Sequence, residues 1–528
     1  MLCHPSLMNI LPLSCVVLVV LVAALFPDVA VSQNLDLTGV TLFRALTTNL
    51  DGTGIRVAQT EAMVGANAWE VDSSQSGLPG RFSYYSSAGS ATVYPNSVGS
   101  SSWHAQLVAT NFYVPLGGVA TNVLHVDNFG AMYFYNYMVS PTTPPNCNDS
   151  IVNQSWIFNG LDVSTQRQVD SGYDNYAARY NTLFVSGAGN GGPVSAPSTC
   201  YNGIAVAVCD GTSSYGPTPD NGRSKPDLTA PGFGTSYSTP YVSGSAAVLL
   251  QAALRGDGGS DTNSAADIRT LKALLLNGAV KPIGWTNSSS APLDTRYGAG
   301  ILNLFNSYKE LSFGKYPFIN SDLVASGGSH PPSGATGTVN ANNGWDFNSI
   351  VSTQASNSVD AVNHYYFNLT GAVYTATATL VWNRQANQNS INNLGLFLYD
   401  TTNSNLIAQS TSPVDNVQHI FLPRLAAGRY DLQVWKAGGA NIVSTNESYA
   451  LVWAFPAPML TVGRAGANVT LSWAVYPAGY AVEATTKYPA TGWGTNNLPG
   501  PVFTTGTNTV TVPATAARQV FRLQQPGS

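Results

Sequence analysis

The stretch that most constrains the fold of this chain runs from Gly234 to Leu254. It begins Gly-Thr-Ser-Tyr-Ser-Thr-Pro-Tyr-Val-Ser-Gly and continues as the apolar run Ser-Ala-Ala-Val-Leu-Leu-Gln-Ala-Ala-Leu. Small and apolar residues occur on several sides of the helix that this run predicts, so we expect the helix inside a core. Ser236 then stands at the helix N-terminus, and Pro240 fits the first turn, where proline is tolerated.

Ser236 has two interpretations at this point. The unpaired backbone N–H groups and the positive end of the helix dipole favour developing negative charge, which suits a serine nucleophile that attacks a carbonyl. A serine that only caps a core helix uses the same N–H groups. The segment alone leaves both interpretations open.

The residues around Ser236 also carry a family resemblance. Gly234, Thr235 and Ser236 are followed by Pro240 and Gly244 and are preceded by Lys-Pro-Asp-Leu-Thr-Ala-Pro-Gly at 225–232. Taken together, these residues resemble the nucleophile segment of the subtilisin-like serine proteases. The resemblance implies an α/β fold, a subtilisin-like parallel sheet flanked by helices, with Ser236 as the nucleophile.

Composition narrows the classes of protein that the chain can belong to. Its 528 residues predict two to four domains, and a hydrophobic content of 44% is sufficient for large cores. Only 9% of the residues are charged and the net charge is −5. Because phosphate binding depends on clustered Lys and Arg, we expect no nucleic-acid partner.

The N-terminal segment predicts export. Residues 11–26 are almost uninterruptedly apolar, and the small residues Ala30 and Ser32 follow them. We therefore interpret residues 1–32 as a signal peptide, with a retained anchor as the alternative. The run is shorter than the roughly 20 residues of a membrane-spanning helix. The expected location is secreted, extracellular or at a bacterial cell surface, without stable membrane insertion after cleavage.

Three cysteines remain after residue 32, and their number and spacing predict at most one disulfide and no metal cluster. Cys147, Cys200 and Cys209 are odd in number, so at most one disulfide forms, with its pairing left open. No Cys-x-x-Cys pair is present and the histidines are scattered. The resemblance allows structural calcium, but no acidic cluster marks a site, so the sequence predicts no cofactor and no metal.

The predicted acid of a catalytic triad is Glu61. Residues 57–61, Val-Ala-Gln-Thr-Glu, read as a short strand that ends on an acidic residue, at the place where the resembled family has the strand of its triad aspartate. A glutamate can also orient an imidazole and stabilise its cation. A solvated glutamate at a strand end is the alternative.

The predicted base is His104. It precedes apolar residues at helical spacing in Ser-Ser-Trp-His-Ala-Gln-Leu-Val-Ala-Thr, and it matches the first histidine of the family's helix segment. Between Glu61 and Ser236 the other histidine is His125, in the strand-like run Val-Leu-His-Val-Asp-Asn. We favour His104 as the base and expect a structural role for His125.

Two further segments predict the oxyanion donor and the substrate cleft. Residues 183–190, Leu-Phe-Val-Ser-Gly-Ala-Gly-Asn, resemble the family's strand whose asparagine amide completes the oxyanion hole, so Asn190 is the expected donor. Residues 150–156 resemble the strand that pairs with substrate and forms a pocket wall. Ile157 stands where the family usually has glycine, which predicts a narrower pocket. The predicted substrate-binding residues are Asn153, Gln154, Ser155, Ala188 and Gly189.

The order acid, base, oxyanion donor, nucleophile is that of the subtilisin-like enzymes rather than of other serine hydrolases. Asp267 to Asn277 predicts another helix, and residues 294–303 resemble a segment that closes many subtilisin-like domains. The resemblance covers about half of the chain, from Gly54 to about Leu311. Few residues separate the predicted signal peptide from the first strand, which leaves little room for a folded prodomain.

The rest of the chain is expected to form two all-β modules. Period-two runs at 375–382 and 428–435, with polar turns between them, predict a β-sandwich over 326–455. Residues 393–400 and 426–430 resemble the sandwich, of the prepeptidase C-terminal type, that is appended to many secreted bacterial peptidases. Residues 456–528 predict a smaller immunoglobulin-like or fibronectin-like module. Expected roles of the modules are substrate docking, surface attachment or stabilisation.

The sequence therefore predicts a secreted serine endopeptidase that hydrolyses protein or peptide substrates, with its peptidase domain at 33–315. Glu61, His104 and Ser236 form the predicted triad, and Asn190 is the predicted oxyanion donor. The departure at Glu61 and the partial match at His104 keep an alternative open, a catalytically inactive scaffold that binds surface proteins or glycans. A serine esterase or amidase on the same residues is a third, weaker interpretation.

Overall fold

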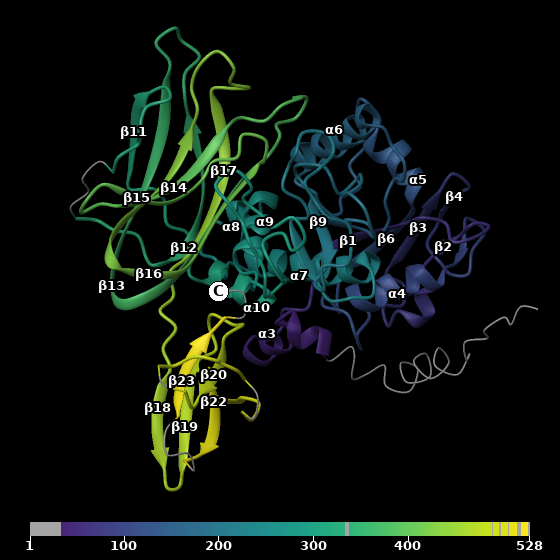
Figure 1. Cartoon of the computed structure of the whole chain (residues 1–528). Coiled ribbons are helices and arrows are strands. Elements are labelled where there is room, and N and C mark those ends of the chain that lie inside the picture. The colour runs from purple at the N-terminus through teal and green to yellow at the C-terminus, as the bar shows by residue number, and fades with distance from the viewer. Residues whose placement is uncertain are drawn as a thin grey trace, which may run out of the picture.

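A computed structural model describes residues 33–332, 337–487, 489–495, 498–504, 506–514 and 519–525. The predicted signal peptide, residues 1–32, lies outside the described residues. Figure 1 shows three units along the chain: an α/β domain, a large β unit at its side and a small β unit at the C-terminal end. The order of the units agrees with the predicted fold class.

The α/β domain is built on one eight-stranded sheet with the order β10-β9-β8-β7-β1-β6-β3-β4. Every neighbouring pair is parallel except β3 and β4, which are antiparallel. A two-stranded parallel ladder, β2 with β5, lies beside it. The strands are β1 (Arg56–Glu61), β2 (Ala68–Glu70), β3 (Phe82–Ser86), β4 (Gly89–Ala91), β5 (Ser100–Ser101), β6 (His125–Gly130), β7 (Ile151–Gln154), β8 (Leu183–Gly187), β9 (Ile204–Val208) and β10 (Leu228–Ala230).

Helices cover the faces of this sheet. The central strands β7, β8 and β9 are buried along their whole length, as expected for a parallel sheet with both faces covered. The predicted parallel sheet flanked by helices is therefore confirmed. The helical elements are α3 (Val40–Leu46), η1 (Ser73–Gln75), α4 (Trp103–Phe112), α5 (Ala131–Tyr133), η2 (Phe134–Val139), α6 (Val163–Tyr180), α7 (Thr235–Arg255), α8 (Thr262–Ala265), α9 (Ile268–Asn277) and α10 (Leu304–Ser312).

Helix α7 is the buried helix that the sequence predicted, with a different first turn. It begins at Thr235 after an uncapped Gly234, so Ser236 is its second residue and Pro240 its sixth. The expectation that Pro240 stands in the first turn was therefore wrong. Proline has no N–H to donate to the carbonyl four residues earlier, which here is that of Ser236. That carbonyl accepts a hydrogen bond from Ser155 Oγ at 3.1 Å instead.

The large β unit is a seven-stranded antiparallel sheet with the order β12-β17-β13-β16-β14-β15, and β11 also pairs with β13. Two long strands run through it, and the register between them shifts near Leu369 and Tyr374. The sheet surrounds a core that includes Trp382, Trp453 and Tyr365. Its strands are β11 (Asn320–Ala325), β12 (Asn343–Val351), β13 (Val359–Trp382), β14 (Leu394–Asp400), β15 (Asn405–Ser410), β16 (Val417–Lys436) and β17 (Asn446–Ala454).

The small β unit holds two antiparallel sheets, β18-β19-β22-β21 and β20-β23. Its core includes Leu471, Trp473 and Val510. Antiparallel strands in both C-terminal units agree with the all-β prediction, and the exact domain limits stay predictions. The strands are β18 (Thr461–Ala465), β19 (Asn468–Ala474), β20 (Ala481–Thr485), β21 (Val502–Thr504), β22 (Thr507–Pro513) and β23 (Val520–Gln524).

The α/β domain and the large β unit share one hydrophobic core. Val381, Val417 and Val452 of the large β unit belong to the same buried cluster as the core of the α/β domain. Figure 1 shows α8 and α9 lying against this unit. Arg269, near the start of α9, donates from Nη1 to the carbonyl of Ser448 at 3.3 Å. The two units are therefore packed together.

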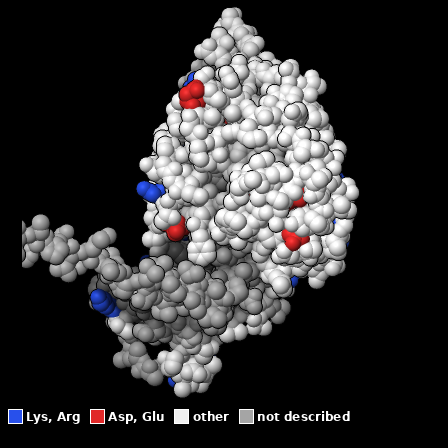
Figure 2. Space-filling model, turned by 90° about the vertical axis from the view of Figure 1, so that its right-hand side faces the viewer, with Lys and Arg blue, Asp and Glu red and all other residues white. Residues whose placement is uncertain are grey.

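The surface carries few charges. Figure 2 shows a face of the molecule on which blue and red side chains are sparse, in agreement with the low charged content.

Cys147, Cys200 and Cys209 are all free thiols, so no disulfide forms among them. Within the described part of the chain, no helix is both long and apolar enough to cross a membrane.

Candidate active site

The predicted catalytic residues come from separate elements that meet at the carboxyl end of the parallel sheet. Glu61 ends β1, Asn190 follows β8 by three residues, and Ser236 opens α7 after β10. His104 is the second residue of α4. Parallel strands carry their C-terminal ends to one edge of a sheet, which is where open α/β sheets place their ligands.

Glu61 is fully buried, and both of its carboxylate oxygens have partners. Gln59 Nε2 donates to Oε1 at 2.7 Å, and His104 Nδ1 lies 2.8 Å from Oε2. Gln59 is itself held, because it also donates to the carbonyl of Ala105 and accepts from Tyr113 OH at 2.6 Å. The network fixes the carboxylate toward the start of α4.

His104 is oriented by Glu61. Ser102 caps α4 by accepting from the backbone N–H of Ala105, which holds the first turn in place. Because a carboxylate only accepts, the neutral imidazole carries its proton on Nδ1 and leaves Nε2 free. Burial lowers the pKa of His104, but the hydrogen bond and the negative charge of Glu61 outweigh it, so the pKa is raised. Its side chain is 17% exposed.

Ser236 and Ser155 form a reciprocal pair. Ser236 Oγ donates to the carbonyl of Ser155 at 3.0 Å, and Ser155 Oγ donates to the carbonyl of Ser236 at 3.1 Å. Among the described residues no hydrogen bond joins Ser236 to His104. Catalytic hydrogen bonds are often long or misaligned in the absence of substrate and tighten when it binds. Transfer of the Ser236 proton to His104 requires that the Ser236 hydroxyl first leave the Ser155 carbonyl.

Asn190 is fixed by the start of α7. Its Oδ1 accepts from the Thr235 backbone N–H at 2.8 Å and lies 3.2 Å from Thr235 Oγ1. Among the described residues, none accepts a hydrogen bond from Asn190 Nδ2. The approach is close, because a Cβ on Gly234 would lie 3.1 Å from Asn190 Oδ1.

The predicted substrate-binding residues divide into two groups. The side chains of Asn153 and Gln154 are buried and used inside the protein, the former on Ser155 and Ser243, the latter on Tyr173 and Ser186. Their main chain lies inside the sheet, paired with β1 on one side and with β8 on the other.

The remaining predicted positions lie near the nucleophile. Ser155 contacts Ser236, and Ala188 and Gly189 end the β8 segment next to Asn190. A Cβ on Gly189 would lie 3.3 Å from Ile157 Cδ1 and 2.6 Å from Ser214 Oγ. Ile157 therefore lies against Gly189, and the narrower pocket stays a prediction.

His125 lies away from this group. It pairs with Arg56 at the first position of the β1–β6 ladder, whereas Glu61 pairs with Gly130 at the last. At about 3.3 Å per residue, the two positions are roughly 16 Å apart along the strands. His125 Nε2 contacts Ser83 Oγ at 3.0 Å and Asp127 at 3.1 Å. These contacts fit the structural role that we expected for it.

Two features of the site were not among the predicted residues. Trp103 is 66% exposed and its ring lies edge-on to that of His104, with centroids 5.6 Å apart. Phe233 is 91% exposed and contacts the ring of Tyr237, the neighbour of Ser236. Trp103 beside His104 and Phe233 three residues before Ser236 were visible in the sequence, but their exposure was not.

The described residues contain no group of three or more His, Cys, Asp and Glu side chains that could hold a metal ion.

Comparison with known proteins identifies the family to which the α/β domain belongs. Residues 81–300 match the model of the subtilase family, peptidase family S8. This range contains His104, Asn190 and Ser236 and begins after Glu61. The chain thus carries a subtilase-family domain and is a subtilisin-like, serine-type peptidase, as the resemblance implied. Peptide substrates follow from that class.

Solved structures of proteases are also similar to this chain. A protease from Pseudoalteromonas arctica is 18% identical over 50% of this chain and 91% of its own, with a TM-score of 0.33. A cold-adapted subtilisin-like serine proteinase is 19% identical over 49% of this chain and 91% of its own, at 0.32. The Aeromonas sobria serine protease, solved in complex with the chaperone, is 13% identical over 80% of this chain and 91% of its own, at 0.35.

Proposed function

We propose that the chain is a secreted serine endopeptidase with a Glu61–His104–Ser236 triad and Asn190 as the side-chain oxyanion donor. The observation that supports it most is the 2.8 Å contact between His104 Nδ1 and the buried carboxylate of Glu61, at the sheet edge where Ser236 opens α7. A buried acid with an imidazole partner next to a helix N-terminal serine is the arrangement that acyl transfer needs.

The chemistry follows from these positions. Ser236 Oγ attacks the peptide carbonyl carbon while His104 Nε2 takes its proton, and the Glu61 carboxylate stabilises the imidazolium that results. The tetrahedral oxyanion accepts from Asn190 Nδ2 and from the Ser236 backbone N–H. His104 then gives the proton to the leaving amine as the C–N bond breaks. Water, deprotonated by His104, hydrolyses the acyl-enzyme and restores Ser236.

Substrate binding is proposed to use the main chain at Ser155 and Gly189, just beyond the ends of β7 and β8. Asn153 and Gln154 are buried and paired within the sheet, so they are proposed to support this edge rather than to contact a peptide. Ile157 beside Gly189 restricts the residue before the scissile bond to a small side chain. The large and small β units are proposed to stabilise the domain or to dock substrate or a cell surface.

The test is labelling with a fluorophosphonate probe and cleavage of denatured casein, by the mature chain and by its Ser236→Ala variant. Labelling and cleavage in the parent alone are expected. If a folded parent shows neither, the catalytic proposal fails and the inactive binding scaffold replaces it. Cleavage of small esters without casein would instead indicate an esterase.

A further inference from the structure

A groove of about 470 Å³ lies along α4, next to the predicted catalytic base His104. Trp103, the residue before His104, lines the groove, and Leu107 continues this wall along the helix. Asp72 and Gln75, at the two ends of η1, line it as well. Ligand pockets range from roughly 300 to 1,000 Å³, so the groove has room for a long side chain. A peptide bound at His104 is close enough to place a side chain there.

Trp103 is the large aromatic residue of this groove. Its side chain is 66% exposed, and the centroid of its ring lies 5.6 Å from that of the His104 imidazole. Among aromatic rings, indole attracts a cation most strongly, and the cation is more often arginine than lysine. Trp103 therefore offers an accessible surface for a cationic side chain directly beside the base.

Asp72 is the charged residue among the described residues that line the groove. It is partly exposed, and its Oδ1 accepts from the backbone N–H and the hydroxyl of Ser74, which fixes the carboxylate. Burial raises the pKa of Asp72, but hydrogen bonds from Ser74 and Gln75 outweigh it, so the pKa is lowered. The carboxylate is thus ionised at neutral pH, and no cationic side chain of the described residues contributes to this shift.

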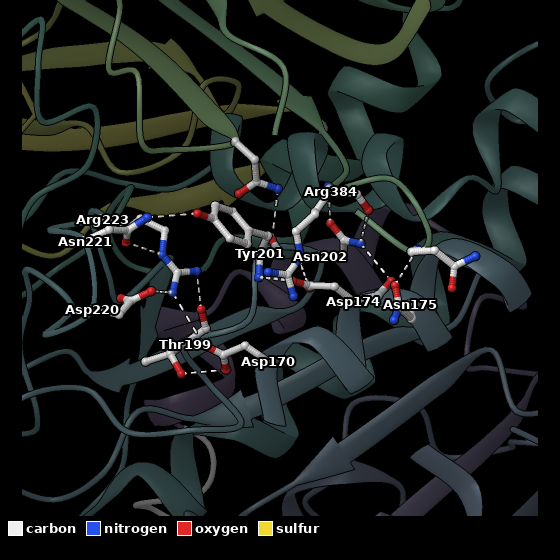
Figure 3. Close-up of polar contacts among 12 residues, drawn as sticks. Asp170, Asp174, Asn175, Thr199, Tyr201, Asn202, Asp220, Asn221, Arg223 and Arg384 are labelled. Atoms are coloured by element: carbon white, nitrogen blue, oxygen red, sulfur yellow. Dashed lines mark hydrogen bonds and ion pairs between the residues drawn. The ribbon is translucent and has the colours of Figure 1, made fainter. Parts of the chain in front are cut away.

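This carboxylate differs from the buried charges between the α/β domain and the large β unit. Figure 3 shows Arg223 between Asp170 and Asp220, whose oxygens lie 3.4 Å and 2.9 Å from Nη2. Those charges are neutralised within the protein and closed to solvent. The charge of Asp72 is neither, so a ligand can pair with it.

We propose that this groove selects peptide substrates with an arginine within about three residues of the scissile bond. The inference rests on the endopeptidase function proposed above and names a class of substrate for it. The guanidinium lies on the indole of Trp103 and is attracted by the Asp72 carboxylate. The methylene stem of the arginine packs on Leu107. An extended peptide advances about 3.3 Å per residue, which limits the distance from the bond that is cleaved.

The charge of Asp72 decides between a cationic and an apolar side chain. Trp103 and Leu107 alone accept an aromatic or aliphatic residue equally well. Such a residue, however, covers the Asp72 carboxylate without giving it a partner, which costs free energy. An acidic residue is repelled. Lysine fits less well than arginine, because a compact, strongly hydrated ammonium stacks poorly on an aromatic ring.

The test is cleavage by the full chain of alanine-rich peptides that carry one arginine, lysine or norleucine. The residue is placed in turn at each of the three positions on either side of the cleaved bond, which mass spectrometry locates. At one position kcat/KM for arginine is expected to exceed that for norleucine about fivefold, and lysine is expected to give about twofold. Added salt is expected to reduce the ratio, because the pair with Asp72 is partly exposed.

Variants assign the preference to the groove. Asp72→Asn and Trp103→Ala are each expected to bring the arginine-to-norleucine ratio close to one. The matched control is Asp51→Asn, because Asp51 also accepts from the backbone N–H and the hydroxyl of a residue two positions on, Thr53. Asp51 precedes β1, whereas Glu61 ends this strand, so the control is expected to keep the parent's ratio. Thermal unfolding of each variant checks the fold.

The possible outcomes separate this inference from the proposed function. A ratio near one at every position, in a chain that cleaves casein, would overturn the inference and leave the endopeptidase function intact. An equal loss in Asp51→Asn would assign the preference to the overall negative charge and overturn it as well. If the parent cleaves no peptide, the endopeptidase function fails, and calorimetric titration of the Ser236→Ala chain decides the inference. Tighter binding of the arginine peptide than of the norleucine peptide, lost on adding Asp72→Asn, would support the groove, and equal binding would overturn it.

Discussion

At the scale of single residues, the contact of Glu61 with His104 carries the catalytic proposal. Both oxygens of Glu61 are satisfied inside the protein, one by Gln59 and one by His104. The extra methylene of glutamate, relative to the aspartate of the resembled pattern, is accommodated without exposing the carboxylate. A glutamate at this position is thus compatible with the orienting role of the triad acid.

Replacing Glu61 by Gln tests that role. A glutamine amide can donate to Nδ1 and so favour the wrong tautomer, and we expect kcat/KM to fall about 10³- to 10⁴-fold. His104 must be neutral to act as base, so activity falls as the pH drops through its pKa. Because the charge of Glu61 raises that pKa, the acidic limb of the pH profile is expected to move to lower pH in the variant. The measurement is kcat/KM against pH.

The matched control for this change is Glu447→Gln. Glu447 is also buried and accepts hydrogen bonds from Asn392 and Gln385, but it lies in the large β unit. Its variant is expected to keep the parent's pH profile. An acidic limb that stays in place after Glu61→Gln would show that the two side chains are not coupled in the active enzyme.

Phe233 is expected to contribute to substrate binding. Its 91% exposed ring is next to the nucleophile segment, and a bound peptide would remove part of it from water. Phe233→Ala is expected to lower kcat/KM by about tenfold, mostly through KM, which corresponds to about 1.4 kcal/mol of lost apolar contact. Steady-state kinetics on a peptide with large residues on both sides of the scissile bond measures it.

Leu116→Ala provides the comparison for Phe233. Leu116 is equally exposed, at 91%, but it follows the C-terminal end of α4, whereas His104 stands at the other end of that helix. We expect no change in KM for this variant. Equal losses in the two variants would assign the effect of Phe233→Ala to the surface in general rather than to the substrate.

At the scale of elements, the sequence predicted what local patterns and motif order determine. The strand that ends on Glu61, the helix that begins near His104 and the buried helix after Ser236 occur as predicted, because their apolar runs and caps are local. The side-chain directions of Asn153 and Gln154 were not predictable, since they depend on Ser243, Tyr173 and other partners far along the chain. The start of α7 near Ser236 was predicted correctly, but Pro240 lies inside the helix beyond its first turn.

The position of Pro240 in α7 couples the helix to Ser155, the residue that follows β7. Because Pro240 cannot donate to the Ser236 carbonyl, Ser155 Oγ does so. Ser155→Ala leaves this carbonyl without a protein partner, and we expect a loss of about 1 kcal/mol in the free energy of unfolding. In a Pro240→Ala background the alanine N–H can replace the lost donor, so the same change is expected to cost less. Urea unfolding of the four proteins of the cycle, with the Ser236→Ala change in each to prevent self-cleavage, gives the interaction energy.

Additive losses in that cycle would contradict the coupling. Asn153 also donates to Ser155 Oγ, at 3.0 Å, and this contact is lost in both backgrounds. It therefore cancels in the cycle. Only the interaction that passes through the Ser236 carbonyl remains in the difference.

At the scale of the whole molecule, the large β unit is packed against the α/β domain and shares its hydrophobic core. Sequence reasoning separated it from the α/β domain because period-two runs begin after about residue 326. It could not show contacts between segments that lie about 200 residues apart. In the structure the two units share a hydrophobic core, and Asp415 and Asn416 bind the segments around Ser224 and Tyr201. Ser224 is only twelve residues before the nucleophile.

This packing predicts that the α/β domain depends on the large β unit. A chain shortened to residues 33–315 lacks the large β unit, so the apolar side chains that Val381 and its neighbours cover become exposed to water. This exposure costs a free energy of roughly 25 cal/mol per Å² of apolar surface. We expect it to be insoluble or to melt well below the parent, with loss of casein cleavage. A chain of residues 33–455, which lacks only the small β unit, is expected to keep the activity and one cooperative transition for the remaining units in differential scanning calorimetry. Two separate transitions in residues 33–455, or full activity in residues 33–315, would show that the α/β domain folds and works alone.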